Sequence, residues 1–104
     1  MCVETHHRNA LDESLVVSSK GGLANAFTYV KSRLEGKTVA TPSTPVAIDQ
    51  NRCWFRPRVF GIQTNQALQI TNSDPVTQSI HATGQINRES NHSQGAGEPP
   101  LARR

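Results

Sequence analysis

The chain has 104 residues and a formal net charge of +3, from eleven Lys and Arg against eight Asp and Glu. This length allows a single domain, and a domain of this size buries only about two-thirds of its unfolded surface. The basic residues are scattered singly except for Arg103 and Arg104, so a nucleic-acid partner is not expected. No run of eighteen apolar residues exists, so no membrane span is predicted.

The first predicted strands lie on either side of a glycine turn. Residues 14–18 form a short apolar run, and the Lys-Gly-Gly sequence at 20–22 supplies the turn chemistry that reverses the chain. Residues 23–31 alternate between two faces and are rich in Phe, Thr, Tyr and Val, which favours a strand over a helix. Residues 32–36 are expected to make one helical turn, and the Thr, Pro and Ser residues of 38–45 predict a connecting loop.

The middle of the chain holds four further strand patterns. Two of them are separated by Asn65 and Gln66, which resembles a tight hairpin. After them, the sequence Asn-Ser-Asp-Pro at 72–75 predicts a firm turn, because Asn and Asp cap their own backbone and Pro fixes φ. The four strands are expected at residues 46–49, 59–64, 67–71 and 78–83.

Short strands spaced by Gly, Pro and Asn turns, with no convincing amphipathic helix, predict an all-β protein with an antiparallel β-sandwich. The sandwich is expected to occupy residues 1–90. Residues 91–104 are rich in Gly, Pro and polar side chains, which predicts an extended polar tail or loop. A sandwich of this kind normally needs about seven strands. The patterns supply fewer, so terminal strands are expected to be lacking.

Cys2 and Cys53 are the two cysteines, and they fit either a single disulfide or two unrelated thiols. A bridge between them would stabilise the fold by roughly 4 kcal/mol in the chain-entropy treatment. It would also imply an oxidising compartment.

Four histidines are the candidates for metal ligation. His6 and His7 are adjacent, and neighbouring side chains of an extended chain point opposite ways, so they cannot easily grip one metal together. His92 lies in the polar tail. His81 follows the 72–75 turn on a predicted strand, where a lone histidine is more often structural than a ligand.

Sequence motifs for catalysis are missing from the chain. No CxxC, HExxH or GxSxG motif occurs, and no paired carboxylates stand in a recognisable context. An enzyme is therefore not expected.

Three segments of the chain match one known family in order and spacing. They are GGLANAFTYVKSRLEGK at 21–37, PVAIDQNRCWFRPRVFGIQTNQALQITNSDP at 45–75 and INRESNHSQ at 86–94. They resemble the early strand, the central hairpin and the following segment of cupredoxin-like domains of exported bacterial proteins, which are related to plastocyanin and often labelled methylamine-utilisation-like. The resemblance implies a Greek-key β-sandwich, a periplasmic or otherwise exported location with the leader outside this chain, and copper-dependent electron transfer with a redox partner protein.

The resemblance also implies a set of site residues. A type 1 copper site uses two imidazoles, a thiolate and a weak axial thioether. The family's first imidazole falls at Gln78 and a further usual histidine at Arg58, while His81 matches a histidine of some relatives and is the candidate ligand by position. An N-terminal cysteine of the family pairs with the one before the F-x-P segment, which implies a Cys2–Cys53 disulfide.

The C-terminal Cys, His and Met ligands of the family have no counterpart before Arg104, and Met1 is the only methionine. The chain is therefore expected to be either a fragment of a longer protein or a degenerate member with an incomplete copper site, and to bind no copper itself. The alternative function is a metal-free β-sandwich that serves as an interaction or carbohydrate-binding module of a larger exported protein.

Overall fold

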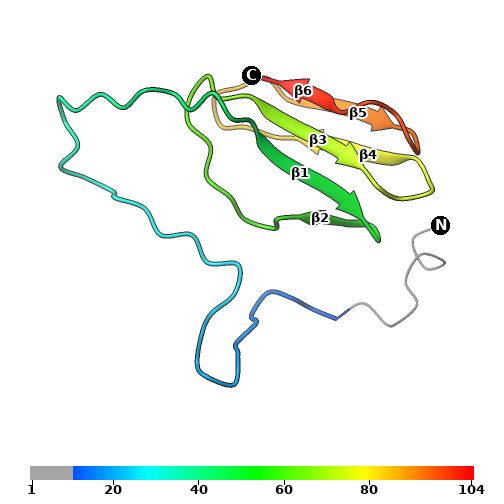
Figure 1. Ribbon diagram of the computed structural model, residues 1–104, viewed down its shortest axis with the longest axis horizontal. Helices are drawn as coiled ribbons and strands as arrows, with labels where there is room; N and C mark the ends of the chain where they lie inside the picture. Colours follow the sequence, from blue (N-terminus) through cyan, green and yellow to red (C-terminus); the bar gives the residue numbers. More distant parts are fainter. Residues whose placement is uncertain (1–10) are drawn as a thin grey trace.

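The structure, a computed structural model, describes residues 11–104, and this part of the chain is all-β with no helix (Figure 1). Its strands form a four-stranded sheet in the order β2-β1-β3-β6 and a two-stranded sheet of β4 and β5. The strands are β1 (Val46–Asn51), β2 (Trp54–Arg56), β3 (Leu68–Asn72), β4 (Gln78–Ala82), β5 (Ser90–Gln94) and β6 (Leu101–Arg103). No helix within 11–104 is therefore available to cross a bilayer.

The larger sheet is mixed. β2 pairs with β1 and β6 with β3 in antiparallel fashion, whereas β1 and β3 run parallel, with Val46 opposite Leu68 and Ile48 opposite Ile70. The prediction of wholly antiparallel pairing is wrong at this pair. Parallel neighbours require a crossover connection, and residues 52–67, which include β2, provide it here.

The two sheets face each other across a small interior. Within 11–104, only Ile70 and Ile80 are buried apolar side chains, at 4% and 8% exposure. The other buried side chains are polar: Gln50, Asn72, Asp74 and Gln94. An all-β arrangement of two facing sheets is thus present, but its interior contains more amide groups than a hydrophobic core usually does.

β1 and β2 are joined by a two-residue turn at Arg52 and Cys53. Both residues have positive φ, 53° and 59°, and the flanking residues Asn51 and Trp54 pair with each other. Positive φ at both central positions is typical of a type I′ turn, which matches the twist of hairpin strands. β2 was not predicted, because three residues are too few to show alternation.

Residues 91–104 differ from the predicted polar tail. β5 pairs along its whole length with β4, and β6 pairs with β3, so this segment supplies an edge strand to each sheet. The sequence Ser-Asn-His-Ser-Gln of β5 has no apolar alternation that could predict a strand. Its inward side chains, His92 and Gln94, are polar, and Gln94 is buried through hydrogen bonds instead of apolar contact.

Residues 11–45 form an extended arm that departs from both sheets and returns to the start of β1 (Figure 1). The predicted strand at 23–31 is absent. Only an isolated bridge between Val17 and Leu23 forms, around a turn in which Gly21 donates a backbone hydrogen bond to Ser18.

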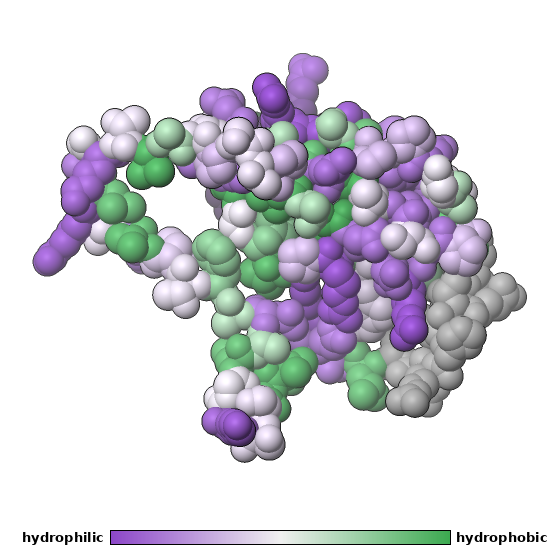
Figure 2. All heavy atoms as spheres, in the orientation of Figure 1, coloured by the Kyte–Doolittle hydropathy of each residue, from purple (hydrophilic) through white to green (hydrophobic). Residues whose placement is uncertain are grey.

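Two other predictions, one inside the arm and one after β2, are also wrong. Residues 32–36 make no helical turn, and 59–64 form no strand. At 59–64 the sequence predicted a strand, but no neighbouring strand pairs with this segment. Many of the arm's apolar side chains are instead exposed, and apolar patches lie on its surface in Figure 2.

Candidate functional site

The carboxylate of Asp74 organises the end of the molecule where the sequence placed its site residues. Asp74 is 4% exposed. It accepts hydrogen bonds from the backbone N–H groups of Arg52 at 2.5 Å and Cys53 at 2.8 Å, and from Nε2 of Gln78 at 2.7 Å. Three donors therefore satisfy one buried carboxylate.

This arrangement fixes the β1–β2 turn. Consecutive backbone N–H groups in a left-handed turn form a concavity that suits an anion, and here the Asp74 carboxylate fills it. A non-glycine residue with positive φ costs of order 1–3 kcal/mol unless its surroundings hold it. The hydrogen bonds from Asp74 help to offset that cost at Arg52 and Cys53.

Gln78 links the same carboxylate to the sulfur of Cys53. Its Nε2 lies 2.7 Å from Asp74 Oδ2 and 3.2 Å from Cys53 Sγ. Cys53 is disulfide-bonded. Cys2, its predicted partner, lies outside the described residues, so the Cys2–Cys53 pairing stays a prediction.

The structure does not bring His81 to this group. Side chains alternate across a strand. Gln78 and Ile80 therefore lie on one face of β4, and Ser79 and His81 lie on the other. His81 lies on the exposed face of β4 and pairs there with Glu89. Gln78 and His81, the two predicted metal positions, therefore cannot meet at one ion.

The donor groups at this end do not fit a type 1 copper site. Gln78 offers an amide in place of an imidazole, and Cys53 offers a disulfide sulfur in place of a thiolate. Arg58 is exposed. Within residues 11–104, no group of three or more His, Cys, Asp or Glu side chains is placed to hold a metal ion. His6 and His7 fall outside the described part of the chain.

A second polar cluster, which the sequence did not reveal, joins the two sheets. Gln94 on β5 accepts a hydrogen bond from Gln50 Nε2 at 2.9 Å and donates to the Ile70 carbonyl at 3.2 Å. The Asn72 amide donates to the Gln94 carbonyl at 3.0 Å. The parallel register of β1 and β3 places Gln50 opposite Asn72. Knowledge of this register would have allowed the cluster to be predicted.

The opposite end of the two sheets is hollow. A cleft of about 770 Å³ opens between the start of β3, the end of β4, the start of β5 and the end of β6. Its apolar lining comes from both sheets and includes Leu68, Ile70, Ile80 and Leu101. His92 also lines this cleft, so the histidine assigned to a solvated tail faces the interior between the sheets.

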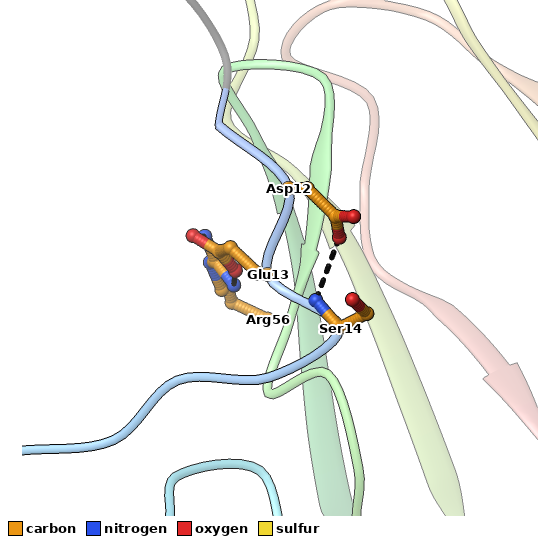
Figure 3. Close-up of polar contacts among 4 residues, drawn as sticks. All are labelled: Asp12, Glu13, Ser14 and Arg56. Carbon is orange, nitrogen blue, oxygen red and sulfur yellow. Dashed lines mark hydrogen bonds and ion pairs between the residues drawn. The ribbon is translucent and has the colours of Figure 1, made fainter.

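The arm is attached to the β2 side of the larger sheet by an ion pair. Arg56 donates two parallel hydrogen bonds to the Glu13 carboxylate, at 2.7 and 2.9 Å (Figure 3). Its guanidinium also lies 5.0 Å from the Trp54 ring centroid. These bonds from Arg56 lower the pKa of Glu13, and Glu13 in turn raises the pKa of Arg56. The pKa of Asp12 is lowered because its carboxylate accepts the Ser14 backbone N–H, at 2.8 Å.

Further along, the arm is held by packing and amide contacts. Phe27 lies over Gly61, so closely that a Cβ on Gly61 would be 2.3 Å from the ring. Gln63 Nε2 donates to the Val39 carbonyl at 2.8 Å, and Gln66 Nε2 donates to Thr44 at 2.9 Å.

In comparisons with known proteins, no family model, no curated protein and no solved structure matches this chain.

Proposed function

We propose that this chain is a metal-free β-sandwich binding module, a degenerate form of the cupredoxin-like domain whose copper-site end has become structural. One observation carries the proposal. Gln78, at the position implied for the first imidazole, donates to Asp74 and contacts the sulfur of Cys53, which is disulfide-bonded. These groups fix the β1–β2 turn, and none of them is left as a thiolate or imidazole for copper.

One feature supports an exported location, and a second supports a binding role. A stable disulfide at Cys53 requires an oxidising compartment. The cleft at the other end of the sheets has a volume within the roughly 300–1,000 Å³ of small-molecule sites. The proposed activity is binding, without a catalytic step.

The test is a titration of the purified, oxidised chain with Cu(II), followed by visible absorption and electron paramagnetic resonance. We expect no thiolate-to-copper charge-transfer band, either in the wild type or in Gln78→His. The variant restores the missing imidazole, but Cys53 still offers no thiolate and His81 still lies on the opposite face. Surface histidines can hold Cu(II) weakly, so His81→Ala serves as the control for that background. A stoichiometric blue band in the wild type would overturn the proposal and restore electron transfer.

A further inference from the structure

The cleft at the end of the two sheets has an apolar floor. Ile70 and Ile80 form its buried base, and Leu68 and Leu101 are partly exposed beside them. These side chains come from facing strands of the two sheets. An elongated apolar group in the cleft would remove the exposed surface of Leu68 and Leu101 from water, at about 25 cal/mol for each Å² buried.

The charged side chains on the rim of the cleft are all basic. Arg88, Arg103 and Arg104 line it, and no Asp or Glu side chain does so among the residues that the structure describes. In that same part of the chain these three arginines make no salt bridge; Arg103 only donates to the neighbouring Ala102 carbonyl at 3.2 Å. Guanidinium groups bind carboxylates through paired hydrogen bonds.

An apolar floor below an unpaired basic rim matches a molecule with the complementary pattern. We propose that the cleft binds an amphipathic carboxylate, with its apolar chain between the sheets and its carboxylate at the arginines. This inference rests on the proposed function, because it names the ligand class of the binding module. Charge complementarity selects an anionic head group over a neutral or cationic one.

The probe is dodecanoate, titrated below its critical micelle concentration into the oxidised chain and followed by calorimetry and by amide chemical shifts. Dodecyltrimethylammonium, with the same chain and a cationic head, is the matched ligand control. We expect saturable binding of dodecanoate, with shifts concentrated at the ends of β4 and β6, and no saturable binding of the cation.

Two pairs of variants locate the site. The double variant Arg88→Gln/Arg103→Gln is expected to bind dodecanoate roughly tenfold more weakly, since it removes charge-assisted hydrogen bonds. Lys31→Gln/Arg58→Gln has the same net charge, and its affinity for dodecanoate is expected to be unchanged.

A second pair of variants tests the interior of the cleft. Ala82→Trp fills the cleft and should abolish binding, whereas Ser79→Trp, on the outer face of β4, should not.

Equal affinity in the two double variants, equal binding of the cation, or no saturable dodecanoate binding would each overturn the assignment of the ligand class. None of these results bears on copper. The proposed function itself fails only if the Cu(II) titration yields a blue band, so the two failures are distinguishable.

Discussion

Asp74 shows how a residue predicted for one structural purpose can serve another. The sequence predicted that Asn and Asp at 72–75 cap their own backbone, and Asn72 does so, accepting the Asp74 N–H at 3.0 Å. Asp74 instead reaches Arg52 and Cys53, more than twenty positions earlier in the chain. The local rule found the turn, but long-range contacts of this kind depend on the fold and leave no pattern in the sequence.

Replacing Asp74 by Asn should destabilise the protein by roughly 1–3 kcal/mol, because an amide nitrogen would face a backbone N–H and leave a buried donor unsatisfied. Urea unfolding followed by Trp54 fluorescence measures the change. Asp12→Asn is the matched control, since Asp12 is exposed and such sites usually change stability by less than about 0.5 kcal/mol. Equal stability of the two variants would show that Asp74 does not hold the turn.

The Glu13–Arg56 ion pair should make attachment of the arm depend on pH. The pKa of Glu13 is lowered from its ordinary value of 4.5 in the folded chain. The stabilisation is therefore fully present above pH 4.5 and is lost as the pH falls through the lowered pKa. Trp54, which lies beside Arg56, should report the release as a fluorescence change at acidic pH.

Glu13→Gln is the control for that titration. It removes the titrating carboxylate but keeps the side chain's size, so the acidic transition should disappear. A transition that persists unchanged in this variant would have to arise from another carboxylate.

At the scale of elements, prediction succeeded where apolar alternation coincided with pairing. β1, β3 and β4 were each expected within a few residues of their observed bounds. The pattern at 23–31 has similar alternation but finds no partner strand, whereas β5 and β6 are paired without it. Alternation describes the side chains, but a strand also requires a neighbour for its backbone groups, and one sequence does not show that neighbour.

The candidate site was predictable only in part, for the same reason. Sequence reasoning singled out Cys53, Gln78 and the 72–75 turn, which the structure brings together. It also grouped His81 with them, although the strand period places that side chain on the other face. The cleft could not be predicted, because its lining comes from four separate strands and from the loops before β3 and β5.

Gly61→Ala should detach the middle of the arm without unfolding the sheets. The added Cβ would lie 2.3 Å from Phe27 Cζ, so the ring, which is 53% exposed, must move away. Chymotrypsin cleavage after Phe27 and Tyr29 is expected to become faster, with little change in the unfolding of the sheets. Gly84→Ala is the control, because its nearest neighbour would be Asn87 at 3.3 Å. An unchanged cleavage rate in the arm would mean that Phe27 does not anchor it.

At the scale of the whole molecule, the disulfide should contribute much of the stability. Only two apolar side chains are buried within 11–104, and loss of a native disulfide from a small domain typically costs 2–5 kcal/mol. Adding a reductant should therefore lower the midpoint of thermal unfolding sharply, and Cys53→Ser should reproduce that midpoint without reductant. Mass spectrometry should show a gain of two hydrogens on reduction. Identical melting curves with and without reductant would contradict this prediction.

The buried polar side chains also affect how stability varies with temperature. Exposure of apolar surface raises the heat capacity on unfolding, whereas exposure of polar surface lowers it. Gln50, Asn72, Asp74 and Gln94 fill positions that apolar residues usually occupy. The heat-capacity increment should therefore fall below the usual 12–15 cal/mol/K per residue. The free energy of unfolding would then follow a flat curve with temperature, and cold would destabilise this protein less than a domain built on an aliphatic core.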